Sequence, residues 1–408
     1  MKANKTILII CATPVEREPR VIRQYESLKK AGFNIIVAGY FERNNSNIFG
    51  ENTISIGLNK FEARSARILL VMLNLIYFQL PPKFRSQLTD RFVLNILFNL
   101  TYLSGVKPKM LIQKIQSQGI CDLEAVISHD HLVSYAGKRI SKVFKAKHVI
   151  DFHEHPLSQY QYKENWEKNK NFIRAIISTA ILDSYKLIFV SDGIKTLISE
   201  EFNIPKEKSV VIRSLPRHEN ILKSYKNGKL ISLIYVGNIN PTRGLENAIM
   251  MMKFLPNNYR LYLQGYGEKQ YINELKDLSR REANSNRVYF LDPVPFHEII
   301  QSISLYDIGY FVCDNFGPQR EFSLPNKIFM YIMSELCVVS SNFQEIANVI
   351  TEYNCGRVVD KFQPLEIAKV INAISRDQLS IFQKNSATAK LDLCWEHEES
   401  KLLKLFDG

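Results

Sequence analysis

The chain has 408 residues, 46% hydrophobic and 23% charged, a composition typical of globular proteins that excludes a largely disordered or fibrous chain. Its 53 lysines and arginines outnumber its 41 aspartates and glutamates, which gives a formal net charge of +12 and predicts an anionic partner. Nucleic acid, an acidic membrane surface and phosphorylated ligands all fit that charge. The six cysteines show no metal-binding or disulfide spacing, which favours reduced thiols and a cytoplasmic location.

Short apolar runs alternate with amphipathic stretches along the chain, a pattern typical of parallel sheets covered by helices. The first run is interpreted as a buried strand and not as a signal peptide, because no small-residue cleavage site follows it. No run reaches the roughly 18 apolar residues of a membrane-spanning helix. The predicted strands form two sets on either side of the polar stretch 215–228, and they indicate two Rossmann-like domains. The first set is Ile7–Cys11, Asn34–Ala38, Ala125–Ser128, His148–Asp151, Leu187–Val190 and Val210–Ile212; the second is Leu233–Val236, Arg260–Leu263, Val288–Leu291, Ile308–Val312, Val338–Ser340 and Arg357–Val359.

Residues 321–350, EFSLPNKIFMYIMSELCVVSSNFQEIANVI, predict a loop with Glu321, a helix over 325–334, a strand Leu336–Ser340 and a second helix opened by Asn342. The first helix would present its N-terminal N–H groups and Lys327 to an anion. Earlier in this half, Arg243 follows a predicted strand and stands before Gly244. Arg243 and Lys327 together predict a two-cation clamp for a diphosphate; the alternative for Arg243 is a solvated surface charge.

Polar residues follow several strands of the first half, where open α/β sheets bind ligands. Arg17, Arg20 and Arg23 follow the first strand and predict either phosphate contacts or solvated helix charges. The runs HDH and HEHP follow two later strands and bring His129, Asp130, His131, His153, Glu154 and His155 toward one edge. Because alternate side chains of an extended segment point to opposite sides, we predict no metal site there.

Residues 64–104 contain two apolar helical faces with basic flanks. Such helices either lie in an anionic membrane interface or pack on the sheet as core helices. The two faces are formed by Leu69, Met72, Leu73, Ile76 and Leu80, and by Phe92, Ile96, Leu100 and Leu103.

Seven short segments, PRVIRQ, DFHE, FVSDGI, YVGN with TRG, QGYGE, LPNK and WEHEE, occur in an order that resembles the family 4 (group 1) retaining glycosyltransferases of the GT-B fold. The resemblance implies two Rossmann-like domains facing a cleft. Residues 1–215 would form the acceptor-side domain and 216–390 the nucleotide-sugar domain, with a C-terminal helix in 391–408 crossing back to the first.

The resemblance also assigns site residues. Met330 stands where the family has a ribose-binding glutamate, and Asn238 stands where it has a second basic residue. The implied catalytic residues are His153, Glu154 and Glu321; the donor-binding residues are Gly237, Asn238, Arg243, Gly265, Gly267, Leu291, Asn326 and Lys327; and the further substrate-binding residues are Arg20, His129 and Asp130.

The implied reaction transfers a sugar from a nucleotide diphosphate sugar, of UDP or GDP type, to a hydroxyl acceptor with retention and without a metal or other cofactor. Glycan or lipid-linked acceptors, as in surface polysaccharide or glycolipid assembly, and the inner face of the cytoplasmic membrane fit this function. A nucleotide-sugar epimerase of the same fold needs no acceptor, and a binding-only relative would explain Met330 and Asn238. Nucleic-acid binding explains the basic charge but not the ordered segments.

Overall fold

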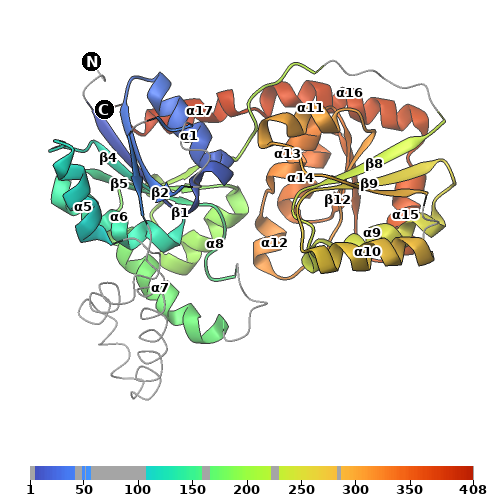
Figure 1. Cartoon of the computed structure of the whole chain (residues 1–408), viewed down its shortest axis with the longest axis horizontal. Helices are drawn as coiled ribbons and strands as arrows, with labels where there is room; N and C mark the ends of the chain where they lie inside the picture. The colour runs from blue at the N-terminus through green and yellow to red at the C-terminus, as the bar shows by residue number, and fades with distance from the viewer. Residues whose placement is uncertain are drawn as a thin grey trace. The chain divides into compact units, whose positions relative to one another are not determined.

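The computed structural model describes residues 5–41, 48–50, 52–56, 107–158, 166–221, 229–282 and 286–407. It contains two compact units: unit 1 comprises Met1–Ile212 and Glu399–Gly408, and unit 2 comprises Arg213–Glu398. Figure 1 shows a β-sheet with helices in each unit. The predicted helices of residues 64–104 lie outside the described residues, as does the 222–228 part of the polar join. The boundaries 1–215, 216–390 and 391–408 remain a prediction.

Unit 1 has a seven-stranded parallel sheet in the order β3-β2-β1-β4-β5-β6-β7. Its strands are β1 (Thr6–Pro14), β2 (Asn34–Tyr40), β3 (Thr53–Ser55), β4 (Ala125–His129), β5 (Lys147–Phe152), β6 (Lys186–Phe189) and β7 (Ser209–Val211). Its helices are η1 (Val15–Arg17), α1 (Pro19–Lys30), α5 (Pro108–Ser117), α6 (His131–Phe144), α7 (Trp166–Leu182), α8 (Asp192–Phe202) and η2 (Lys206–Lys208).

The central strand β1 is buried on both faces. Leu8 and Ile10 belong to a core cluster that includes side chains of α5 and α6, and Ile7 and Ile9, which alternate with them, are also fully buried. Continuous apolar strands of this kind form where helices cover both faces of a parallel sheet. The interpretation of this segment as a buried strand is therefore confirmed.

Unit 2 has a six-stranded parallel sheet in the order β10-β9-β8-β11-β12-β13. Its strands are β8 (Ile231–Val236), β9 (Tyr259–Gln264), β10 (Val288–Leu291), β11 (Ile308–Phe311), β12 (Cys337–Ser341) and β13 (Gly356–Val359). Its helices are η3 (Pro241–Arg243), α9 (Leu245–Met251), η4 (Met252–Phe254), α10 (Lys269–Glu282), η5 (Phe296–Glu298), α11 (Ile299–Ile303), α12 (Pro318–Phe322), α13 (Asn326–Met333), α14 (Gln344–Glu352), α15 (Pro364–Asn372) and α16 (Arg376–Asp392); α17 (Trp395–Lys404) begins in unit 2 and ends in unit 1.

Helices form layers on both sides of the unit 2 sheet. In Figure 1, α9 and α10 lie on one side of the strands, and α11 and α16 lie on the other. Contacts of α9 with α10 and α15, and of α13 with α11 and α16, agree with this arrangement. In each sheet the chain starts in the centre, builds outward to one side and then returns to the other. The strand order therefore reverses between β1 and β4 in unit 1 and between β8 and β11 in unit 2, and such points bind ligands in open α/β sheets.

Three local features differ from the sequence prediction. Strand β3 was not predicted, because three residues do not make a recognisable apolar run. Glu321 lies in the short helix α12 instead of a loop. Helix α14 begins at Gln344, and Asn342 instead donates a side-chain hydrogen bond to Asp360. Among the described residues, no helix is long and apolar enough to cross a membrane.

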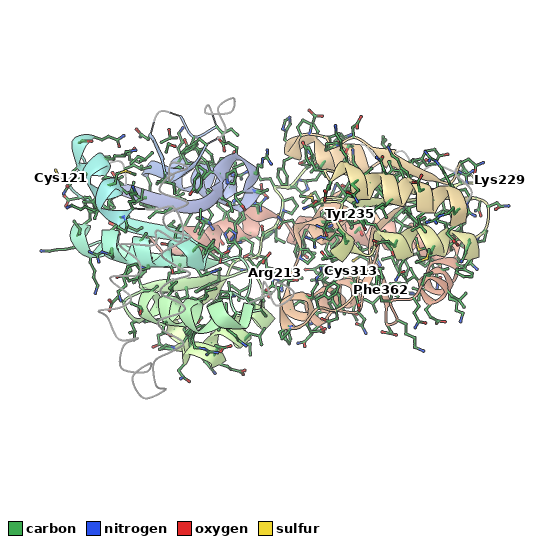
Figure 2. The ribbon with its side chains drawn as sticks, turned by 60° about the horizontal axis from the view of Figure 1, so that its bottom comes forward. Cys121, Arg213, Lys229, Tyr235, Cys313 and Phe362 are labelled. Atoms are coloured by element: carbon green, nitrogen blue, oxygen red, sulfur yellow. The ribbon has the colours of Figure 1, made fainter. Side chains whose placement is uncertain are left out.

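The cysteines of the described residues are free, as their spacing predicted. Cys121, however, is exposed on unit 1 and is not buried like the others (Figure 2). At the C-terminus Trp395 and Leu402 are fully buried, and Phe406 stacks edge-on against Phe33 with ring centroids 6.1 Å apart. The last ten residues thus pack as part of unit 1.

Candidate functional site

Lys327 lies at the point where the strand order of the unit 2 sheet reverses. Its ammonium nitrogen is 4.0 Å from the ring centroid of Tyr235 on β8 and 4.7 Å from that of Phe311 on β11. Pro325 precedes α13 and no side chain caps the start of this helix, so Lys327 stands in its first, uncapped turn. Burial lowers the pKa of Lys327 well below its usual value, and the positive charges of Arg243 and Arg320 lower it further. A cation held in this way is stabilised by an anion that reaches it.

Arg243 is the second cation at this edge. It ends the short helix η3, which Asn240 caps by accepting hydrogen bonds from the backbone N–H and the hydroxyl of Thr242. Gly244 follows with φ +70°, and a Cβ there would lie 2.7 Å from the ring of Phe362. Within the part of the chain that the structure describes, the Arg243 side chain has neither a hydrogen bond nor a carboxylate partner, and its Nε is buried.

Arg320 of α12 is a third cation, which the sequence interpretation missed. Its guanidinium donates to Cys313 Sγ at 2.8 Å and to the Thr242 carbonyl at 2.9 Å, so it bridges the segment after β11 and the loop that carries Arg243. Burial raises the pKa of Cys313 and of Tyr235, both labelled in Figure 2, and the positive charge of Arg320 opposes both rises. The sequence offered only one signal, an arginine a few residues before the LPNK segment.

The predicted glycines bring two backbone segments together beside this cation cluster. The N–H of Gly237 donates to the Gln264 carbonyl, and that of Ile239 donates to the Tyr266 carbonyl. A Cβ on Gly265 would lie 1.8 Å from the Gly237 carbonyl oxygen, and one on Gly237 would lie 3.2 Å from Lys327 Nζ. The glycines are therefore required for close approach of protein groups, whatever ligand they also contact.

Four other predicted donor residues lie at or near the same carboxyl edge of the unit 2 sheet. Asn238 is exposed and directly follows Gly237, while its carbonyl accepts from the Tyr235 hydroxyl. Gly267 forms an isolated bridge with Ile239, Leu291 ends β10, and Asn326 is the first residue of α13. Their contacts with a nucleotide remain predictions.

Glu321 and Met330 have identifiable structural roles. One Glu321 oxygen accepts from the backbone N–H of Gln344, at the start of α14, and the other accepts from the Asn315 side chain. Met330 is only 8% exposed and packs in the core cluster of unit 2. The predicted catalytic role of Glu321 near a sugar would thus have to coexist with its hydrogen bond to α14.

A buried ion pair organises the carboxyl edge of the unit 1 sheet. Arg20 on α1 donates through Nε and Nη2 to both carboxylate oxygens of Asp151, at 2.7 and 2.9 Å. Gln24, one turn later, donates to the same carboxylate at 2.5 Å. Burial opposes ionisation of Asp151, but the nearby charges, led by Arg20, outweigh it and lower the pKa to about 2. The Arg20 charge is therefore compensated by Asp151 in the free protein.

Two histidines extend this network where the unit 1 strand order reverses. His129 lies opposite Asp151 in the register of β4 and β5, and its Nδ1 is 2.9 Å from His153 Nε2. Burial lowers the pKa of His129 to about 3, despite the opposing charge of Asp151, so the ring is neutral near pH 7. His129 Nε2 is buried without a hydrogen-bond partner. His153 is the more exposed of the two rings.

Asp130, predicted to bind substrate, caps α6. Its carboxylate accepts from the backbone N–H of His131 at 2.8 Å and lies 2.9 Å from His131 Nδ1. Its φ of +71° is a strained conformation for a residue other than glycine. Glu154 is partly buried beside His153 in sequence. The structure thus gives Asp130 a local reason for its position, and its contact with substrate stays a prediction.

His129, Asp151 and His153 offer ligand atoms within 4.8 Å of one another. Alternation along one segment does not keep these ligand atoms apart, because His129 ends β4 whereas Asp151 and His153 lie in and just after the neighbouring β5. A cation at this cluster would compete with the Arg20 guanidinium for Asp151. The absence of an essential metal stays a prediction.

The sequence-predicted residues therefore form two groups. In unit 2, Gly237, Arg243 and Lys327 gather where the strand order reverses, and in unit 1, Arg20, His129 and His153 do so. Gln24 and Asp151 were not among the predicted site residues, although Gln24 follows Arg20 by one helical turn. That spacing is the signal that could have indicated a shared partner.

Comparisons with known proteins bear on the family of unit 2 and on the fold. The sequence model of the family "Glycosyl transferases group 1" matches residues 216–390. No curated protein sequence matches the chain. Among solved structures, sucrose-phosphate synthase from Thermosynechococcus elongatus has a TM-score of 0.72 at 13% identity, with 99% of this chain and 98% of that chain covered.

Two further solved structures are similar over their whole length. HepE of Anabaena, crystallised with UDP and glucose, has a TM-score of 0.69 at 12% identity and coverage of 98% and 99%. A glycosyltransferase from Rickettsia africae has a TM-score of 0.65 at 16% identity and coverage of 99% and 98%. The predicted fold class, two parallel-sheet Rossmann-like domains of the GT-B type, is confirmed.

Proposed function

We propose that this protein is a glycosyltransferase that moves a sugar from a nucleotide diphosphate sugar to a hydroxyl acceptor. The observation that carries the proposal is the position of Lys327 and Arg243 where the unit 2 strand order reverses, with no carboxylate partner among the described residues. The family match over residues 216–390 supports the same reaction class.

The chemical role of these cations follows from the reaction. When the bond between the sugar and the diphosphate breaks, negative charge grows on the leaving diphosphate. Lys327 is held between the Tyr235 and Phe311 rings before the reaction, and its repulsion by Arg243 in the free protein is relieved by that charge. The N–H groups in the first turn of α13 add partial positive charge at the same place. These groups would do the work that a divalent ion does in metal-dependent transferases.

The acceptor side of the reaction is assigned to unit 1. His153 is partly exposed, and its Nε2 lies 2.9 Å from Nδ1 of the buried His129, which in turn lies 3.7 Å from the Asp151 carboxylate that pairs with Arg20. We propose that His153 and Glu154 contact the transferred sugar or the acceptor hydroxyl, with Arg20, His129 and Asp130 forming or supporting the same site. Glu321 is proposed as the donor-sugar carboxylate of unit 2.

The finer features rest on the sequence resemblance. They are membership of family 4, retention at the anomeric carbon, a hexosyl donor of UDP or GDP type and independence from metal. A glycan or lipid-linked acceptor, surface polysaccharide or glycolipid assembly, and peripheral contact with the inner face of the cytoplasmic membrane through residues 64–104 complete the proposal. UDP and UDP-glucose bound to HepE of Anabaena support a UDP donor.

The experiment is a calorimetric screen against UDP, GDP, ADP, CMP and their common sugars, repeated on Lys327→Ala. We expect one nucleoside diphosphate to bind wild-type protein and to bind the variant much more weakly. Turnover is then measured with and without candidate acceptors, with the anomeric configuration of the product read by NMR. Nucleotide release only with an acceptor supports transfer, whereas conversion of the donor without one identifies an epimerase. A folded protein that binds no nucleotide refutes the proposed function.

A further inference from the structure

Arg320 has the surroundings of an anion-binding residue and not those of a structural ion pair. Its guanidinium uses two of its five N–H donors, toward Cys313 Sγ and the Thr242 carbonyl, and both acceptors are uncharged. Its face lies over the ring of Phe316, with the central carbon 5.0 Å from the ring centroid. No carboxylate of the described residues pairs with it.

Arg320 shares its electrostatic environment with the two proposed clamp residues. The positive charges of Arg243 and Arg320 both lower the pKa of Lys327, which burial has already lowered. Burial raises the pKa of Cys313, and Arg320, Lys327 and Arg243 each oppose that rise. Three cations therefore act on one thiol, and their mutual repulsion favours a ligand with more than one negative charge.

The hydrogen bonds of Arg320 also couple the two segments that a diphosphate would touch. Thr242 directly precedes Arg243, and Cys313 follows β11, whose Phe311 ring contacts the Lys327 ammonium. The guanidinium is thus anchored to the residue that precedes Arg243 and to the segment that follows the Lys327 contact on β11. Asn238, at the end of β8, is exposed and carries no charge that could take this place.

We propose that Arg320 binds the diphosphate of the donor directly, as a third cation beside Arg243 and Lys327, and supplies the positive charge that position 238 lacks. This inference rests on the proposed function, and it makes the site selective for diphosphates over monophosphates. A guanidinium suits this role because its planar fork contacts two phosphate oxygens at once.

The test measures binding of inorganic pyrophosphate, and of the nucleoside mono- and diphosphate of the donor base, to Arg320→Gln by calorimetry. We expect diphosphate and pyrophosphate affinity to fall about 10-fold or more, as for the loss of a hydrogen bond between charged groups, and monophosphate affinity to fall much less. Arg280→Gln is the matched control, because Arg280 is exposed on α10 and its one ion pair among the described residues is with Asp277; this variant should bind within about twofold of wild type. Adding Asn238→Arg to Arg320→Gln should restore most of the lost affinity.

Four outcomes overturn the inference. If Arg320→Gln fails to fold, Arg320→Lys takes its place; it keeps the charge but not the planar fork, so its pyrophosphate affinity should still fall below that of Arg280→Gln. Diphosphate affinity equal to that of Arg280→Gln, or a parallel loss for mono- and diphosphate, would show that Arg320 acts only on loop structure; so would failure of the Asn238→Arg rescue. If wild-type protein binds pyrophosphate but no nucleoside diphosphate, the proposed function fails. The pyrophosphate titrations of Arg320→Gln then still show whether Arg320 binds the anion. If it binds neither, both fail.

Discussion

Replacing Lys327 by methionine should separate stability from ligand binding. Methionine is unbranched and nearly as long as lysine, so it fills the space between the Tyr235 and Phe311 rings without the charge. The variant loses two cation–π contacts, worth about 0.5–2 kcal/mol each. It also loses the cost of holding an ammonium group away from water beside two other cations. We expect the free energy of unfolding to stay within about 1 kcal/mol of wild type or to rise.

Binding of a diphosphate should respond in the opposite direction. A hydrogen bond from an ammonium group to phosphate contributes about 1.5–3 kcal/mol, which corresponds to a loss of roughly 10- to 150-fold in affinity. The same substitution thus leaves the fold intact, or stabilises it, while binding weakens. Groups placed for a ligand at the expense of stability behave in this way.

The stability and the diphosphate affinity should both depend on pH through Lys327. The pKa of Lys327 in the free protein lies below its unfolded value, so the unfolded chain binds more protons in the interval between them. The free energy of unfolding of the wild type therefore rises with pH across that interval, and Lys327→Met should remove this rise. Because a bound anion raises the pKa of Lys327, wild-type affinity should fall as pH increases through the free-protein pKa, and the variant should lose that fall.

The assays are urea unfolding and calorimetric titration with the donor nucleoside diphosphate, both as a function of pH. Arg280→Gln serves as the surface-charge control. Unchanged affinity of Lys327→Met, or a loss of more than about 2 kcal/mol of stability without a change in affinity, would refute the assignment of Lys327 to the anion site.

Two other substitutions test the remaining network. Asp151→Asn leaves the buried Arg20 without its counter-charge and should destabilise unit 1 by about 3–5 kcal/mol in urea unfolding at pH 7. Because the pKa of Asp151 is lowered to about 2, the stability difference between wild type and variant should shrink as pH falls from about 4 toward 2. A stability difference that does not change with pH would contradict the ion pair. Glu321→Gln replaces one carboxylate oxygen by an NH2 group, which cannot accept the hydrogen bond from the Gln344 N–H or from the Asn315 side chain. The loss should lower the free energy of unfolding by about 1 kcal/mol, measured by thermal unfolding. An unchanged kcat in the same variant would refute the catalytic role of Glu321.

The strands were predictable because of their burial. Each predicted strand overlaps an observed one, since a strand covered on both faces needs a continuous apolar run, such as the one around Ile9. The missed strand β3 contributes only Ile54 to the core, so its sequence carries no such run. The start of α14 was misplaced because Asn342, a good capping residue by type, bonds to Asp360 instead.

The site was less predictable, because its partners are distant in sequence. Arg20 was predicted to contact substrate, and its partner Asp151, 131 residues later, meets it only because α1 packs over the end of β5. Arg320 was missed because its role depends on a five-residue helix that brings it to Thr242. Residue type and position along the chain indicate that a cation is present; only the fold shows which cations are already neutralised.

The two units differ in how the charges of their cations are balanced. In unit 1 the charge of the buried Arg20 is already balanced by Asp151, which also accepts a hydrogen bond from Gln24, and the neutral His129 lies 2.9 Å from His153. In unit 2 the cations near Lys327 have no such carboxylate among the described residues, so that network reaches electrostatic balance only when an anion binds. Phosphate recognition is therefore expected in unit 2, and recognition of uncharged hydroxyl groups in unit 1.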